Sequence, residues 1–176
     1  MIKVARPHVG EEEVAALREV LLSGYYVSGK KVAEFEELFA AFVGTSHAVA
    51  VNSGTAALHL TLAALGVGPG DEVIVPPLTF FSTVSCVLHQ NAIPIFADID
   101  PHTYCLDPGD VEKRITTRTK AIIAVHLFGQ ATEMDDLMGV IKKRDIPVIE
   151  DCAQAHGTTY NGNVVGSIGN AGAFSF

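Results

Sequence analysis

The sequence has few cysteines and few positive charges. Its three cysteines, Cys86, Cys105 and Cys152, lie far apart in the chain, and they match neither a disulfide framework nor the ligand spacing of a zinc site. We therefore expect small, mostly buried thiols and no metal. The chain carries 12 Lys and Arg against 20 Asp and Glu, a formal net charge of −8, which disfavours nucleic acid as a partner.

Long apolar runs and the common nucleotide-binding motifs are also missing. No run approaches the length needed to span a bilayer, and the N-terminal MIKVARPHVGEEE lacks the apolar core of a signal peptide. We expect a cytoplasmic protein without membrane contact. The chain has no Gly-Lys-Ser/Thr motif and no G-x-G-x-x-G after its first expected strand, so a nucleotide-binding oxidoreductase is poorly supported.

The spacing of apolar residues predicts helices in the first quarter of the chain. With 176 residues, 48% of them hydrophobic, the chain is long enough to bury a core. Apolar residues recur at helical spacing over 11–22 and 32–42, and Gly44 ends the second of these helices. We therefore divide the chain into an N-terminal helical segment, 1–44, and a larger domain, 45–176.

Strands and helices alternate from His47 onward. This alternation is typical of βαβ units, and it predicts an α/β three-layer sandwich with a mainly parallel sheet. Pro94 indicates that its strand lies at an edge of the sheet or that the proline is at the start of the strand. We interpret Gly162 to Gly169 as turns. The expected strands are 48–51, 72–75, 93–96, 121–125, 146–151 and 171–176, and the expected helices are 55–65, 79–90, 109–114 and 134–144.

The apolar run that starts at Ile146 ends on two acids, Glu150 and Asp151. The carboxyl ends of parallel strands are where open α/β sheets bind ligands. Burying a carboxylate without a partner is costly, so a cation should meet one of these acids. That cation is either a Lys or Arg of the chain or a ligand that must be kept protonated.

Other strand ends supply hydroxyls, an aromatic ring and a histidine. Ser53, Gly54 and Thr55 open a helix and predict a phosphate seat, although an ordinary N-cap is the commoner role of such residues. Phe80 could pack in the core or stack on a flat ring. His126 could touch a ligand or be a structural histidine, and the sequence leaves this open.

A phosphate seat, a stacking aromatic and a buried acid together suggest pyridoxal 5′-phosphate (PLP). This cofactor needs its phosphate anchored, its ring sandwiched and its pyridine nitrogen protonated. Asp151 would hold that proton, and the cation that the buried acid requires would then be the pyridinium.

Several motifs follow one another in order along the chain. They are Asn52-Ser-Gly-Thr-Ala-Ala-Leu58, Gly66-Val-Gly-Pro-Gly-Asp-Glu-Val-Ile-Val-Pro76, Asp98-Ile-Asp-Pro101, His126-Leu-Phe-Gly129, Glu150-Asp-Cys-Ala-Gln-Ala-His-Gly157 and Phe174-Ser-Phe176. Together they closely resemble the DegT/DnrJ/StrS aminotransferases, which are sugar aminotransferases of PLP fold type I. The resemblance covers essentially the whole chain.

The resemblance implies a role for each matching residue. Gly54, Thr55 and Ser175 would bind the phosphate, and Phe80 would stack on the ring. Asp151 would pair with the pyridine nitrogen as the catalytic acid, and Gln154 would contact the ring hydroxyl. Such enzymes usually transfer an amino group from glutamate to a keto group of a nucleotide-linked sugar and form homodimers with shared active sites. A few relatives are dehydratases, which stays an alternative.

One departure concerns the lysine that forms the Schiff base with the cofactor. In the family it lies a few residues after the Phe-Ser-Phe motif, and this chain ends at Phe176. Lys120 and Lys142 do not match that context. The family's C-terminal domain, and the strand that separates the first and last large-domain strands seen here, are absent too. We expect an incomplete PLP-binding domain that is inactive alone, or else a non-catalytic remnant that acts as a binding or regulatory module.

Overall fold

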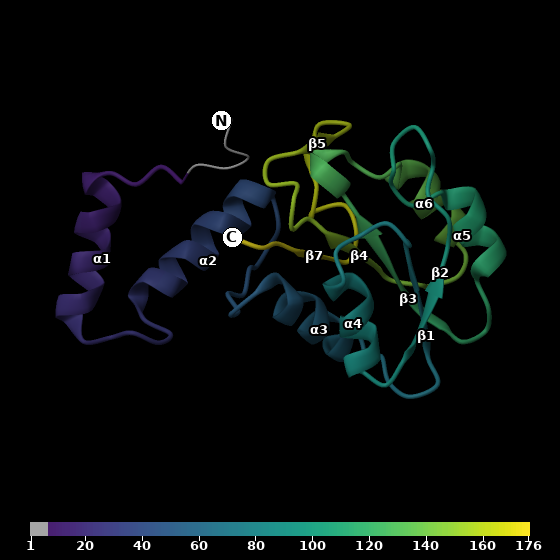
Figure 1. The fold of residues 1–176 in the computed structure, drawn as a ribbon, viewed down its shortest axis with the longest axis horizontal. Helices are drawn as coiled ribbons and strands as arrows, with labels where there is room; N and C mark the ends of the chain where they lie inside the picture. Colours follow the sequence, from purple (N-terminus) through teal and green to yellow (C-terminus); the bar gives the residue numbers. More distant parts are fainter. Residues whose placement is uncertain (1–6) are drawn as a thin grey trace, which may run out of the picture.

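The computed structural model describes residues 7–176, so residues 1–6 of the expected N-terminal segment lie outside the described part. Its main feature is a sheet of five strands in the order β2-β1-β3-β4-β7, and every neighbouring pair is parallel (Figure 1). The helices are α1 (Glu11–Ser23), α2 (Lys30–Val43), α3 (Gly54–Ala64), α4 (Ser82–His89), α5 (Pro108–Arg114), η1 (Leu127–Gly129) and α6 (Met134–Ile141). The strands are β1 (Glu72–Val75), β2 (Ile93–Phe96), β3 (Thr119–Val125), β4 (Val148–Asp151), β5 (Thr159–Tyr160), β6 (Asn163–Val164) and β7 (Ala171–Ala173).

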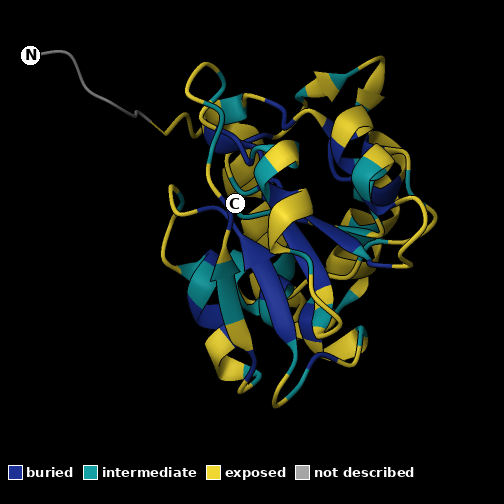
Figure 2. Cartoon of the chain, turned by 90° about the vertical axis from the view of Figure 1, so that its right-hand side faces the viewer, coloured by how far each residue is buried: buried dark blue, intermediate teal, exposed yellow. Residues whose placement is uncertain are grey.

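Helices cover both faces of the sheet, so the predicted three-layer sandwich is confirmed. Alternate residues of β3 point to opposite faces. Ile123 packs in the core beneath α3 and α4, and Ile122 packs in the core beneath α5 and α6. Both side chains are fully buried, and Figure 2 shows the central strands as the most continuously buried part of the fold. The near-continuous apolar strands of the sequence follow from burial on both faces.

The N-terminal helices lie beside this sandwich. Helix α1 buries none of its residues and stands apart from the sheet in Figure 1. Helix α2 packs against the end of the chain, because the Phe39 ring lies 4.9 Å from the Phe174 ring and 5.3 Å from the Phe176 ring. Within residues 7–176, no helix is both long and apolar enough to cross a membrane.

The predicted strand at 48–51 is wrong, because these residues form no regular structure. A strand needs a hydrogen-bonded neighbour. Between this segment and β7, at the edge of the sheet, lies a groove of about 560 Å³ lined by residues of both. Within the described residues no strand pairs with Val49 or Val51, so their backbone stays irregular.

Other boundaries shift by a few residues. The expected strand 171–176 is regular only over Ala171–Ala173, and its last residue, Phe176, is exposed. Helix α4 begins at Ser82 rather than Thr79, and α6 ends at Ile141 rather than Arg144. The placement of Pro94 at an edge is confirmed, because β2 is one of the two edge strands of the sheet.

Candidate functional site

The two acids at the end of β4 are both buried, as the sequence predicted. Their side chains serve opposite faces of the sheet, because successive residues of a strand alternate. Among residues 7–176, neither acid pairs with a Lys or an Arg. The protein cation that the sequence allowed for is therefore not found at either acid.

Glu150 is held inside the protein by a dense set of donors. Its Oε2 lies 2.9 Å from His126 Nε2 and accepts the Gly166 N–H at 2.8 Å, and its Oε1 accepts the N–H groups of Ile168 and Gly169 at 2.8 and 2.6 Å. Burial raises the pKa of Glu150, but these hydrogen bonds outweigh it and the net shift is downward. Glu150 therefore organises the 166–169 loop that leads to β7.

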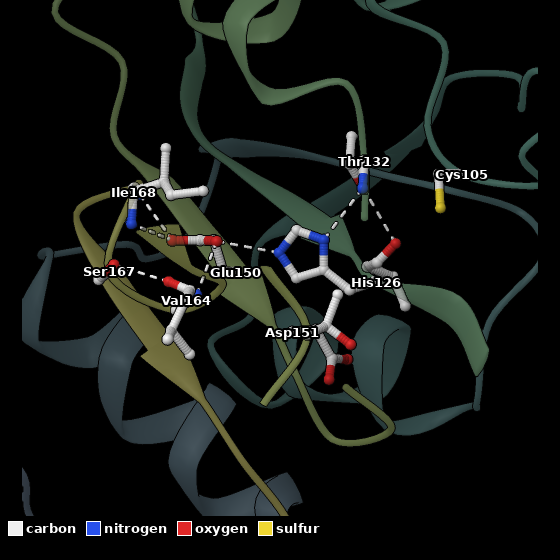
Figure 3. A network of polar contacts seen from close by, with 12 residues as sticks. Cys105, His126, Thr132, Glu150, Asp151, Val164, Ser167 and Ile168 are labelled. Atoms are coloured by element: carbon white, nitrogen blue, oxygen red, sulfur yellow. Dashed lines mark hydrogen bonds and ion pairs between the residues drawn. The ribbon is translucent and has the colours of Figure 1, made fainter. Parts of the chain in front are cut away.

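His126 belongs to the same network, so it is a structural histidine rather than a ligand contact. It follows β3 and is fully buried. Its Nδ1 accepts the N–H of Thr132 at 3.1 Å while Nε2 faces Glu150, and Figure 3 shows the ring engaged on both sides. With both ring nitrogens used, His126 orders the turn after β3.

One side-chain cluster has the composition of a metal site. His126, Glu150 and Cys152 bring potential ligand atoms within 4.8 Å of one another. The Glu150 oxygens and His126 nitrogens already make hydrogen bonds, and burial, followed by the nearby acids, raises the pKa of the Cys152 thiol. We interpret the cluster as a hydrogen-bonded core. All three cysteines are free and buried, as the sequence predicted.

Asp151 faces the other side of the sheet, where it accepts fewer hydrogen bonds than Glu150 does. Its Oδ2 accepts the hydroxyl of Thr83 at 2.9 Å, and its Oδ1 accepts the N–H of Ala153 at 3.2 Å. Burial dominates and raises the pKa of Asp151 above its ordinary value. A carboxylate in this state gains most from a cationic partner, because pairing would offset the cost of burial.

The predicted phosphate seat lies at the start of α3. Ser53 is its N-cap and accepts the Ala56 N–H at 3.2 Å, so the ordinary capping role is present. The N–H groups of Gly54 and Thr55 precede the first intrahelical bond, from Ala57 to Ser53, and are therefore available to an anion. A Cβ on Gly54 would lie 2.8 Å from Ser175 Cβ, so the two predicted phosphate residues are in close approach.

The two remaining predicted residues lie at the surface. Phe80 is 72% exposed, so it is not a core residue, and it lies just before α4, where its carbonyl accepts the Thr83 N–H. Gln154 accepts the Phe128 N–H on Oε1 at 3.1 Å, which leaves its amide hydrogens free to donate. Phe128 itself has a positive φ of 55°, which is uncommon for a non-glycine residue.

Sequence reasoning missed the residues that connect these groups. Thr83 holds Asp151, and Ser82 Oγ lies 2.6 Å from Thr55 Oγ1. One signal could have identified Thr83, because it shares a helix face with the apolar Cys86 and Val87 three and four residues on. A hydroxyl on a buried stripe requires a polar partner.

The set of donors and acceptors fits PLP. Free N–H groups and hydroxyls at the start of α3 suit a phosphate, and Gly54 allows the close approach of Ser175. Asp151 is a buried carboxylate on the same sheet edge that pairs with no Lys or Arg in the described part of the chain, and exposed Phe80 adjoins the helix that holds it. These groups come from α3, α4, β4 and the segment after β7.

Comparison with known proteins gives the same class. The PLP form of a Streptococcus pneumoniae protein assigned as a sugar aminotransferase superposes with a TM-score of 0.96 at 38% identity, covering 99% of this chain and 48% of that one. The fold is therefore that of the large domain of PLP-dependent aminotransferases. The chain belongs to the DegT/DnrJ/EryC1/StrS aminotransferase family, whose model matches residues 7–176.

Two curated relatives illustrate the range of the family. The chain is 52% identical to the spore coat polysaccharide biosynthesis protein SpsC of Bacillus subtilis over 170 residues, covering 97% of this chain and 44% of the relative. It is 45% identical to the dTDP-3-amino-3,6-dideoxy-alpha-D-galactopyranose transaminase of Aneurinibacillus thermoaerophilus over 161 residues, covering 92% of this chain and 44% of the relative. The chain thus spans less than half the length of these relatives.

Proposed function

We propose that this chain supplies the cofactor-binding part of a PLP-dependent aminotransferase that transfers an amino group from glutamate to a keto group of a nucleotide-linked sugar. The observation that carries the proposal is Asp151, a carboxylate buried at the carboxyl end of β4 that pairs with no Lys or Arg among residues 7–176. Ser175 follows the adjacent strand β7 and meets Gly54 at the start of α3, so an anion seat shares this edge of the sheet.

The names of the relatives support the substrate class. One is a transaminase of a dTDP-linked amino sugar, and another serves polysaccharide biosynthesis in a spore coat. Both are consistent with a keto group on a nucleotide-linked sugar as the amino acceptor.

Each predicted site residue has a distinct task in this proposal. The N–H groups of Gly54 and Thr55, together with the hydroxyls of Thr55 and Ser175, would hold the phosphate. Phe80 would cover one face of the ring, and Gln154 would donate an amide hydrogen to the ring hydroxyl. Bound PLP would act as the electron sink for the reaction.

Asp151 would keep the pyridine nitrogen protonated. Its carboxylate would accept the hydrogen bond from that nitrogen, and the resulting ion pair would be screened little because the acid is buried. Ser53 would cap α3 and so fix the direction of the free N–H groups. The amine that would bind the cofactor covalently is not among these residues, so we propose that this chain is inactive alone. We also propose a homodimer as the active assembly, and the cytoplasmic location stays a prediction.

The experiment supplies the amine in trans. A C-terminal segment that carries the family's lysine is expressed separately, mixed with this chain and PLP, and assayed with glutamate and a panel of nucleotide-linked keto sugars. We expect amino-sugar product from the mixture and none from either piece alone. Deoxy-sugar product without amino transfer would indicate a dehydratase, and PLP binding without turnover by an assembled pair would indicate a binding module.

Asp151→Asn tests the central assignment in the same assembly. The amide has no charge to keep the ring nitrogen protonated, so we expect amino transfer to fall by about 100-fold or more. Asp145→Asn, in the exposed turn before β4, is the matched control and should keep wild-type rates. Equal rates for the two variants would contradict the role of Asp151.

A further inference from the structure

Asp151 accepts two hydrogen bonds, one from its own turn and one from a different helix. The N–H of Ala153, two residues along, reaches Oδ1. The hydroxyl of Thr83, which comes from helix α4 and is fully buried, reaches Oδ2 at 2.9 Å. Thr83 is therefore the side chain from outside β4 that fixes the direction of the carboxylate.

The direction of the Thr83 hydrogen bond follows from chemistry. A carboxylate only accepts, so the single hydroxyl hydrogen of Thr83 goes to Asp151. Thr79 Oγ1 lies 2.7 Å from Thr83 Oγ1, and with the hydrogen of Thr83 already used, Thr79 must donate to it. The result is a directed chain of hydroxyls from Thr79 through Thr83 to Asp151, in which each bond polarises the next.

Helix α4 connects this chain to the phosphate seat. Ser82, the neighbour of Thr83, lies within hydrogen-bond distance of Thr55. The helix itself is fixed by Cys86 and Val87, which are fully buried in the core under α3. One rigid helix thus contacts both ends of the proposed cofactor site through two consecutive residues.

We propose that Thr83 is a positioning residue that holds the Asp151 carboxylate ionised and in one orientation before any ligand binds, with Thr79 completing the hydrogen-bond chain. The purpose of this arrangement rests on the proposed function, in which Asp151 meets a ring nitrogen. The Thr83–Asp151 link itself is independent of that function and can be tested without cofactor.

Around Asp151, neutral hydrogen-bond donors rather than charged groups hold the carboxylate. Burial favours the neutral acid, whereas Thr83, Ala153 and the nearby His126 ring favour the carboxylate. Glu150, on the same strand, faces the opposite side and is occupied by the 166–169 loop. Burial and Asp151 raise the pKa of Cys86 on α4 to about 12, and the pKa of Cys152 is raised as well, so both thiols are neutral.

The test is a carbon-13 NMR titration of the Asp151 carboxyl carbon in the 1–176 chain, without cofactor. Thr83→Val keeps the shape of the side chain and removes the donor, so we expect the pKa of Asp151 to rise by about one unit. Thr83→Ser restores the donor and should titrate as wild type. Thr79→Val should give a smaller rise, because it removes only the polarising partner.

Thr61→Val is the matched control. Its hydroxyl bonds to the Ala57 carbonyl within α3, so it should leave the Asp151 titration unchanged. An unchanged Asp151 titration in Thr83→Val would overturn the proposal. A shifted titration in Thr83→Ser would also overturn it, because this variant keeps the hydroxyl and loses only the methyl group, so packing would then control the pKa of Asp151. If Thr83→Val does not fold, the Asp151 titrations of Thr83→Ser and Thr79→Val test the proposal instead. An unshifted Asp151 pKa in Thr79→Val would then contradict the chain of hydroxyl hydrogen bonds.

A second measurement separates this inference from the proposed function. Pyridoxamine phosphate, which has no aldehyde to react with surface lysines, is added to the wild-type chain while the Asp151 carbon is observed. A shifted Asp151 signal supports the cofactor site. A rise of the Asp151 pKa in Thr83→Val together with no response to pyridoxamine phosphate would uphold the Thr83 link and contradict the proposed function.

Discussion

Glu150 and Asp151 are neighbours in β4, yet their surroundings drive their ionisation in opposite directions. Hydrogen bonds from His126 and backbone N–H groups lower the pKa of Glu150 despite its burial, whereas burial dominates at Asp151 and raises its pKa. The first acid has its full set of partners within the protein and is structural. The second pairs with no Lys or Arg among residues 7–176, so its carboxylate is available to a ligand. A perturbed pKa of this kind is typical of a group at a functional site.

At this scale we predict that Glu150→Gln destabilises the fold strongly. The amide replaces one acceptor oxygen with an NH₂ group, which would face N–H donors of the 166–169 loop. We expect the free energy of unfolding to fall by about 3 kcal/mol, as measured by urea denaturation followed by circular dichroism. Glu112→Gln, at an exposed pair with Arg144, should cost less than about 0.5 kcal/mol.

The effect of Glu150→Gln should depend on pH. Because the folded-state pKa of Glu150 is lowered, its charge contributes stability above the ordinary carboxyl pKa and loses it as the pH falls through the folded-state value. The difference between wild type and variant should be full at neutral pH and shrink in acid. A difference that is constant from neutral to acidic pH would show that charge plays no part.

Phe128 provides a test of backbone strain. It is 81% exposed and has a φ of 55°, a conformation that glycine adopts without a steric penalty. We expect Phe128→Gly to be more stable than Phe128→Ala by about 1 kcal/mol in urea denaturation. At Phe81, which is 69% exposed with a φ of −53°, the order should reverse. The same order at both positions would contradict the strain.

The sequence predicts the two acids and the phosphate residues from their types and their places between expected elements. Asp151 and Ser175 follow the adjacent parallel strands β4 and β7, and the alternation of strands and helices reveals that edge of the sheet, whereas Gly54 opens α3. Thr83 was missed because its partner lies far away in sequence, and the pairing depends on how α4 is rotated over the sheet. Local patterns do not specify that rotation.

At the scale of elements, the strand at 48–51 shows the limit of pattern reading. Its apolar residues favour a strand, but no strand forms, because pairing is a property of two segments. The Asn161-Gly162 turn shows the opposite case, since both residues have positive φ and close the β5–β6 hairpin. That signal is local, so a short-range pattern suffices for it.

The contact between α3 and the segment after β7 gives a prediction for Gly54→Ala. The new Cβ would lie 2.8 Å from Ser175 Cβ, so one element must move, at a cost of about 1–3 kcal/mol in urea denaturation. Gly68→Ala, where a Cβ meets nothing within 4 Å, should be neutral or stabilising.

A second substitution tests whether that contact is the cause. Ser175→Gly removes the clashing Cβ, so the double variant Gly54→Ala/Ser175→Gly should recover part of the lost stability. Strictly additive losses in the two variants would show that the cost of Gly54→Ala arises elsewhere.

At the scale of the whole molecule, apolar side chains are exposed along the groove beside β7. Val49 is 79% exposed, and Leu60 and Phe176 in the same groove are exposed as well. A sheet edge next to such a surface favours association. We predict concentration-dependent self-association of 1–176 in sedimentation velocity experiments, and Val49→Lys should reduce it.

The control for that prediction is another exposed valine. Val27, between α1 and α2, is 85% exposed but does not line the groove. Val27→Lys adds the same charge, so it should leave association nearly unchanged. Equal reduction by both variants would mean that net charge, rather than the groove, controls association.

The packing of α2 against the end of the chain has a kinetic consequence. Phe39 touches Phe174 and Phe176, and the same terminal segment brings Ser175 against Gly54. These contacts join residues far apart in the chain, and such long-range contacts form slowly because a large loop must close first. During synthesis the sheet from β1 to β4 can begin to fold as it emerges, but the predicted phosphate seat also needs Ser175, which emerges later. The proposed ligand site would therefore be completed on a scaffold that is already in place.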